Sequence, residues 1–252
     1  MPPPLALFRA DLHIHTTLSP CGDLEMTPRT IIAKAKERQL DLIGVCDHNT
    51  TRQCAEIQKV GRRENIFVLC GAEVTTREEI HCLAFFETPE TLADFQRFLD
   101  DNLPPVPNNV EQCGHQLLVD EDERILHAFP YWLPNALTKT IDEVAAKVRR
   151  LNGLFIPAHI DKARNSLLSQ LGFVPPDLPF DALELAPPAP GRPPQTPLPA
   201  QPPGALIWSS DAHCPDEIGR ASTELRMKEP SFKELKYALQ HGHITKSIDR
   251  RP

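Results

Sequence analysis

The chain lacks the features of a membrane protein, a secreted protein or a broadly basic nucleic-acid binder. It has no run of the roughly 20 apolar residues that a membrane-spanning helix needs. Its first residues, MPPPLALFRAD, contain neither the basic segment nor the long apolar segment of a signal peptide. With 27 basic and 34 acidic residues, the formal net charge is -7, which gives no basic field for nucleic acid. We expect a cytoplasmic protein with no membrane partner, and nucleic acid only as a short oligonucleotide or nucleotide substrate.

The sequence also lacks the cysteine motifs of disulfide and zinc-thiolate proteins and the serine motif of a covalent hydrolase. The seven cysteines are an odd number and form no CxxC pair, which argues against a disulfide framework and against a thiolate zinc knuckle. No GxSxG sequence marks a serine nucleophile on a strand-to-helix turn. A covalent mechanism through serine or cysteine is therefore not what this sequence predicts.

Several short apolar runs end in a carboxylate or an imidazole, and this regularity is the most informative pattern in the chain. Apolar runs of this length suit strands that are buried on both faces, as in parallel sheets, whose carboxyl ends collect catalytic groups. The runs are Leu12 to His15, Leu40 to His48, Ile66 to Glu73, Leu154 to His159, and Ala205 to His213.

Helical segments lie between these runs, so the sequence predicts an α/β fold. Helix starts are indicated by Thr27-Pro28, by Thr140 with Glu143 three residues later, and by the similar Ser231 to Glu234. Residues 175 to 204 are dense in proline, which favours extended backbone without ladder hydrogen bonds. We expect one domain over residues 1–252, with a proline-rich surface loop at about 186–204.

Polar residues at these strand ends have the types and spacing of a metal site. His13 and His15 are two residues apart, so their side chains lie on the same side of a strand and can bind one ion. This HxH spacing is a weak signal alone, but His48, Glu73, His159, Asp211 and His213 end the other runs. A mixed imidazole and carboxylate set suits Zn, Mn or Fe, and a carboxylate can bridge two ions.

The motifs resemble those of a known family. ADLHIHTTLSPCGDLEMTP, IGVCDHN, LCGAEVTTREEIHCLAFF, LFIPAHID and WSSDAH follow the order of the motifs of the PHP (polymerase and histidinol phosphatase) family. The resemblance extends from about Leu7 to Gly242. It implies a distorted (β/α)7 TIM-like barrel with two or three divalent metal ions and a phosphoesterase activity.

The resemblance also implies a ligand set. A first ion would be bound by His13, His15, Glu73 and Asp211, and a second by a bridging Glu73 with His81 and His159. A third would use His48, His213 and Asp23, with Cys21 or Glu25 as alternatives to Asp23. Glu73 and Asp211 are then the residues assigned to catalysis.

A bound hydroxide is a strong nucleophile at such a centre, so we expect hydrolysis of a small phosphorylated metabolite or nucleotide. Arg164, beside Lys162, and Arg77 are candidates for binding the substrate phosphate, because arginine binds phosphate oxygens in pairs. Two alternatives stay open: an amidohydrolase-like enzyme that cleaves a C–N bond, and a non-catalytic metal-binding regulatory domain. No apolar run ends in the lysine that often bridges ions in amidohydrolases.

Overall fold

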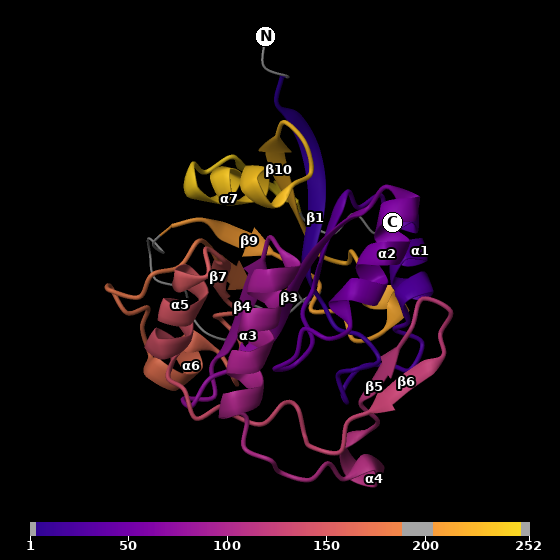
Figure 1. The fold of residues 1–252 in the computed structure, drawn as a ribbon. Helices are drawn as coiled ribbons and strands as arrows, with labels where there is room; N and C mark the ends of the chain where they lie inside the picture. Colours follow the sequence, from indigo (N-terminus) through magenta and orange to yellow (C-terminus); the bar gives the residue numbers. More distant parts are fainter. Residues whose placement is uncertain (1–3, 188–203, 248–252) are drawn as a thin grey trace.

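The computed structural model describes residues 4–187 and 204–247, and it is a mixed α/β fold, as the sequence predicts (Figure 1). The strands are β1 (Ala6–Ile14), β2 (Leu42–Val45), β3 (Phe67–Thr75), β4 (His81–Phe86), β5 (Leu117–Val119), β6 (Ile125–Ala128), β7 (Leu154–Pro157), β8 (Leu183–Leu185), β9 (Leu206–Trp208), β10 (Ser222–Met227) and β11 (Ile244–Ser247). The helices are α1 (Pro28–Glu37), α2 (Cys54–Glu64), α3 (Pro89–Asn102), α4 (Val110–Cys113), α5 (Ile141–Arg150), α6 (Leu167–Leu171) and α7 (Phe232–Gln240), with a 3-10 turn η1 (Pro215–Glu217).

A curled sheet of seven strands in the order β11-β10-β1-β2-β3-β4-β7 is the framework of the molecule. The strands β1, β2 and β3 run parallel, whereas β4 is antiparallel to both β3 and β7. The pair β8-β9 lies between the two end regions of this sheet: Ile160 N, after β7, donates to Glu184 O on β8 at 2.8 Å, and Trp208 N on β9 donates to Thr223 Oγ1 on β10 at 2.8 Å. The described strands therefore approach a closed ring.

Of the expected distorted (β/α)7 TIM-like barrel, the structure confirms the mixed α/β fold with a curled sheet but not seven regular β/α units. Residues 76–80 join β3 to the antiparallel β4 as a short loop, so the strict alternation of parallel strands and helices fails there. The proline-rich tract at about 186–204 falls almost entirely outside the described residues. Within residues 4–187 and 204–247, no helix is long and apolar enough to cross a bilayer.

Apolar side chains fill the inside of the curl and two layers outside it. The inner core includes Leu12, Leu69 and Leu83, and α7 packs against it near β10 (Figure 1). One outer core lies beneath α1 and α2, and the other lies beneath α3, α5 and α6. Because the inner core occupies one end of the curl, the polar strand ends meet at the other.

A β-bulge in β1 directs the HxH pair into the curl. Asp11 pairs with Ile43 and Ile14 pairs with Val45, so β1 has one residue more than β2 over this stretch. Such a bulge bends the strand and changes which face a side chain occupies. Leu12 accordingly belongs to the inner core, whereas Ile14, two residues later, belongs to an outer one.

Three predicted helix starts are confirmed. Thr27 and Ser231 cap α1 and α7, accepting hydrogen bonds from the backbone N of Thr30 and Glu234. Thr140 forms a full capping box at α5. At α7 the box is incomplete, because the Glu234 side chain accepts from Lys228 N instead.

Candidate metal centre

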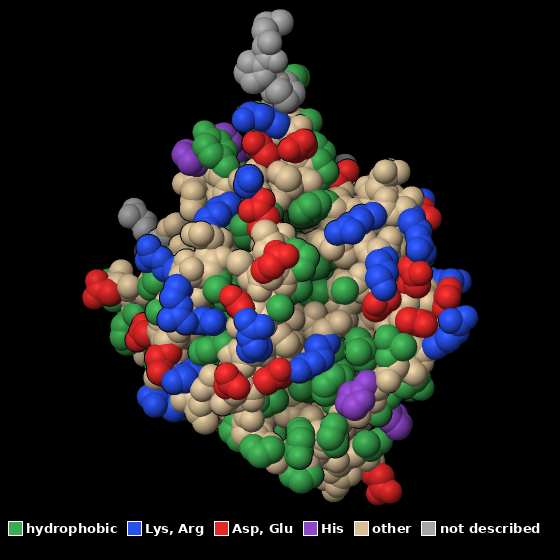
Figure 2. Space-filling model, in the orientation of Figure 1, with side chains coloured by type: hydrophobic (Ala, Val, Ile, Leu, Met, Phe, Trp, Pro, Cys, Tyr) green, Lys and Arg blue, Asp and Glu red, His purple; other side chains and the backbone are tan. Residues whose placement is uncertain are grey.

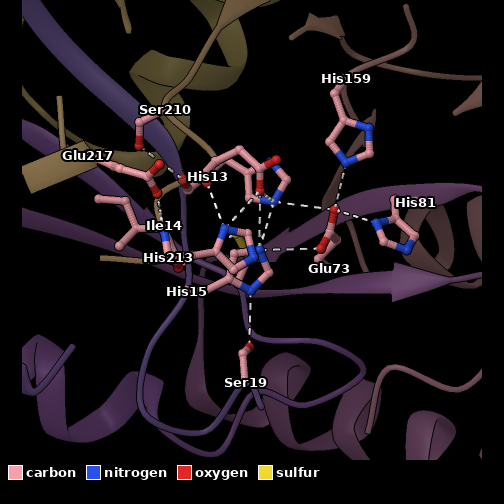
Figure 3. A network of polar contacts seen from close by, with 12 residues as sticks. His13, Ile14, His15, Ser19, Glu73, His81, His159, Ser210, His213 and Glu217 are labelled. Carbon is pink, nitrogen blue, oxygen red and sulfur yellow. Dashed lines mark hydrogen bonds and ion pairs between the residues drawn. The ribbon is translucent and has the colours of Figure 1, made fainter. Parts of the chain in front are cut away.

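Six imidazoles and two carboxylates meet where the strands β1, β2, β3, β7 and β9 end and β4 begins. They are His13, His15, His48, His81, His159, His213, Glu73 and Asp211. Figure 3 shows His13, His15, His81, His159 and His213 around Glu73. All but His81 and His213 are buried. The structure thus brings these eight predicted ligands together from positions scattered over 200 residues of chain.

Hydrogen bonds on the outer nitrogens fix the orientation of the first two rings. His13 Nδ1 donates to Glu184 Oε2 at 2.9 Å. His15 Nδ1 lies 3.0 Å from Ser19 Oγ, which itself donates to Asp47 Oδ1 at 2.7 Å, so the serine oxygen accepts from the ring. Both Nε2 atoms then face inward, only 3.2 Å apart.

Glu73 is the central carboxylate of the cluster. It lies on β3, on the same face as Leu69 and the inner core. Its Oε1 is 2.9 Å from His81 Nδ1 and 3.1 Å from His159 Nε2. Its Oε2 is 3.1 Å from His48 Nδ1. The two oxygens of this one carboxylate thus face different imidazoles, which is the arrangement of a bridging ligand.

Asp211 lies on the turn after β9 and faces the same point as Glu73. Its Oδ1 is 3.3 Å from His13 Nε2 and 3.4 Å from His15 Nε2. Its Oδ2 forms an ion pair with the half-buried Lys162. Burial would lower the pKa of Lys162, but the Asp211 carboxylate raises it, so the lysine is charged.

Two cluster residues have strained backbone. His159 has φ of 29° and Asp211 has φ of 51°, in the left-handed region that non-glycine residues rarely occupy. Strain of this kind costs on the order of 1–3 kcal/mol and persists at functional sites. The fold therefore holds these two side chains in place at an energetic cost.

The donor set fits a divalent cation. Two Nε2 atoms at 3.2 Å cannot both carry a proton, so at least one presents a lone pair toward the other ring. Burial opposes ionisation of Glu73, yet His81 and His13 lower its pKa well below the usual range. Burial likewise disfavours charge on His15, but its bonds to Asp211 and Glu73 raise its pKa to about 9. The cluster thus stabilises positive charge at its centre.

The described residues contain three groups that could hold an ion, each with its candidate ligand atoms within 4.8 Å of one another. One is His13, His15 and Glu73, and another is His48, Glu73 and His81. The third is His15, Cys21, His48 and His213.

Asp23, the residue expected to complete the third group, is not part of it. Its side chain is exposed, and Oδ1 accepts a hydrogen bond from Glu25 N at 2.9 Å. Glu25 is exposed as well. Of the three candidates in this loop, the structure brings Cys21 next to the histidines.

The two arginines expected to bind phosphate are both exposed. Arg77 follows β3, where its backbone N donates to Lys139 O, and Arg164 lies two residues beyond Lys162. Within the described residues, neither guanidinium has a hydrogen bond or ion pair assigned to it. Lys162, rather than either arginine, contacts a cluster carboxylate.

Glu184 is a site residue that the sequence pattern did not single out. It lies on β8 and is buried, and its Oε2 accepts from His13 Nδ1 and from His159 N at 3.1 Å. Its short strand, Leu183–Leu185, has an acidic residue between two apolar ones. The sequence signal that could have identified Glu184 is an acidic side chain between two apolar residues of a buried strand.

The fold and the cluster define an α/β protein with a group of potential metal ligands at the strand ends. Residues 11–130 match the family model of the PHP domain, and residues 206–244 match that of the PHP-associated region. The chain is therefore a PHP-domain protein with a PHP-associated C-terminal region.

Known proteins are similar to this chain in part of its sequence or in its fold. The uncharacterized protein MJ1587 of Methanocaldococcus jannaschii is 35% identical over 79 residues, which cover 28% of this chain and 46% of that protein. The lesion-specific endonuclease Q of Pyrococcus furiosus superposes with a TM-score of 0.66 at 20% identity, covering 94% of this chain and 56% of the endonuclease. A two-domain Bacteroides vulgatus protein with a predicted PHP-like metal-dependent phosphoesterase superposes at 0.56 and 14% identity, covering 97% of this chain and 66% of that one.

The chain spans about half the length of MJ1587 and of endonuclease Q. A second endonuclease Q structure contains a 27-mer duplex substrate with an abasic lesion at the active site, and superposes with a TM-score of 0.60 at 21% identity, covering 94% of this chain and 57% of that one. Our expectation that nucleic acid is a partner only as a short oligonucleotide or nucleotide is wrong, because this endonuclease of similar fold has a DNA duplex as its substrate. Net charge is a property of the whole surface, whereas a scissile phosphate meets local cations at the site.

Proposed function

We propose that the chain is a metal-dependent phosphoesterase whose substrates include phosphodiesters of nucleotides or nucleic acid. The observation that carries the proposal is the convergence of His13, His15, Glu73 and Asp211 on one point. Their facing nitrogen and oxygen atoms lie 3.2 to 3.4 Å apart, and at least one of the two facing Nε2 atoms carries no proton. Divalent ions bound there would activate a water molecule and neutralise charge on the phosphoryl oxygens.

The chain's own residues have distinct tasks in this proposal. Glu73 holds two groups of imidazoles around its two oxygens, which fixes their separation. Glu184 and Ser19 bond the outer nitrogens of His13 and His15, which keeps the inner nitrogens available as ligands. Lys162 fixes the Asp211 carboxylate.

Substrate phosphate needs positive donors at the mouth of the site. We propose Arg164 and Arg77 for this role, since both are exposed on loops that follow the strands carrying His159 and Glu73. Arginine offers a planar pair of N–H donors to phosphate oxygens. Figure 2 shows acidic and basic side chains interspersed on the helical face, so on this side phosphate binding would depend on a few local cations.

Hydrolysis of synthetic esters tests the proposal. The protein, loaded in turn with Mn²⁺, Zn²⁺ or Fe²⁺, is assayed with an aryl phosphate monoester, a bis-aryl phosphodiester and a duplex containing an abasic site. We expect metal-dependent release of the aryl alcohol, abolished by chelation and inhibited by inorganic phosphate. Hydrolysis of an amide or cyclic imide without phosphate inhibition would instead support a C–N hydrolase.

A further inference from the structure

Cys21 lies in a third group of potential ligand atoms, which shares His15 and His48 with the two groups that contain Glu73. The ligand atoms of His15, Cys21, His48 and His213 lie within 4.8 Å of one another. They come from the loop after β1, the end of β2 and the turn after β9, so the fold and not a local motif assembles them.

The histidines of this group have nitrogens available for an ion. His213 Nδ1 donates to Asp211 O at 2.8 Å, which leaves Nε2 with the lone pair. His48 is only 6% exposed, and its Nδ1 lies 3.1 Å from Glu73 Oε2 without forming a hydrogen bond to it. A ring nitrogen of His48 also belongs to the group with Cys21, so this buried imidazole serves both groups.

The loop that carries Cys21 is closed by the backbone. Ser19 N donates to Thr16 O at 3.1 Å, and Gly22 N donates to Ser19 O at 2.9 Å. A Cβ on Gly22 would lie 2.6 Å from Thr16 O, so this tight turn requires glycine. The turn places Cys21 beside the histidines, while Asp23 N donates to His213 O at 2.7 Å and its carboxylate stays outside.

We propose that Cys21 binds a metal ion as a thiolate together with His48 and His213. This inference rests on the metal centre of the proposed function. It assigns a sulfur ligand to the third of the three groups that could hold an ion. Thiolate with imidazole is a soft donor set that favours zinc or ferrous iron, whereas a carboxylate at this position would suit manganese. The third position therefore selects a softer metal than the pair around Glu73.

Cobalt substitution tests the sulfur ligand directly, because a cobalt–thiolate bond produces a sulfur-to-cobalt charge-transfer absorption in the near ultraviolet. The full chain is stripped, reloaded with Co²⁺ and examined by absorption and elemental analysis. We expect the band in the wild type, its loss with about one fewer cobalt per chain in Cys21→Ser, and the cobalt but not the band in Cys21→Asp.

Two variants serve as controls. Asp23→Ala and Cys113→Ser should keep both the band and the cobalt content, since Asp23 faces solvent and Cys113 belongs to no metal-holding group of the described residues. A wild type without the band, or loss of one cobalt in Asp23→Ala and not in Cys21→Ser, would overturn the proposal.

The outcome is separable from that of the proposed function. A charge-transfer band that depends on Cys21, in a protein that hydrolyses no phosphate ester, would refute the phosphoesterase and leave the thiolate site standing. Phosphate ester hydrolysis by a protein without the band would refute only the thiolate site.

Discussion

Glu73 is the residue whose loss should disturb the centre most, because its two oxygens face separate imidazoles. We expect Glu73→Gln to lose more bound metal and more activity than His81→Asn or His159→Asn, each of which removes one contact to a single oxygen. Elemental analysis and steady-state rates on the three variants measure this. Full metal content and a near-normal rate in Glu73→Gln would rule out the bridging role.

Glu184 should act through His13 rather than on substrate. Glu184→Ala removes the acceptor that orients His13 Nδ1, and loss of such a hydrogen bond to a metal-binding histidine typically costs ~10- to 100-fold in metal affinity. Glu184→Gln retains an oxygen acceptor and should recover part of that loss. Competition titrations against a chelator measure both variants, and an unchanged affinity in Glu184→Ala would show that the bond does not matter.

At the scale of single elements, the bulge in β1 is what aims the HxH pair, and Gly44 on β2 makes room for it. A Cβ at Gly44 would lie 2.4 Å from Leu12 O. Gly44→Ala must push β1 away from β2. We therefore expect a loss of about 1–3 kcal/mol in stability, the usual cost of overpacking, together with weaker metal binding.

The capping box of α5 provides a matched control for the glycine change. Thr140→Ala removes a helix cap whose side chain bonds Glu143, which is not a cluster residue, and should cost about 1 kcal/mol. Metal content should not change. Denaturant melts and elemental analysis of both variants separate a general loss of stability from a misdirected pair of histidines. Equal metal retention in both would mean that the bulge does not position the ligands.

Local sequence signals predicted some elements and missed others for physical reasons. Thr27, Thr140 and Ser231 are caps that act on their own helices, so the sequence alone reveals them. The antiparallel direction of β4 and the bulge in β1 depend on pairing between distant strands, which no local pattern encodes.

The candidate site could likewise be predicted where local sequence signals suffice, and not where the conformation of the folded chain decides. Seven of the eight cluster residues could be expected because polar residues follow buried apolar runs, whereas His81, which begins β4, was expected only from the family resemblance. Choosing among Asp23, Cys21 and Glu25 required the conformation of the loop, since all three lie within five residues. Glu184 belongs to a strand of three residues, too short to show a pattern.

At the scale of the whole molecule, nucleic acid would bind through a few local cations on a surface whose net charge is -7. If Arg164 and Arg77 make the phosphate contacts, log affinity for a duplex should fall with log salt at a slope of about -2. Arg164→Ala should reduce this slope by about 1. Titrations at several salt concentrations measure it. A slope of about -6 or steeper would mean an extended basic surface that this account lacks.

The central claim is that the imidazole and carboxylate cluster holds divalent ions on which hydrolysis depends. Elemental analysis of the purified protein, followed by chelation, assay and metal readdition, tests it most directly. The account predicts two or three transition-metal ions per chain, loss of phosphate ester hydrolysis as they are removed, and its return when metal is restored. Metal-free protein with an intact fold and undiminished hydrolysis would contradict it.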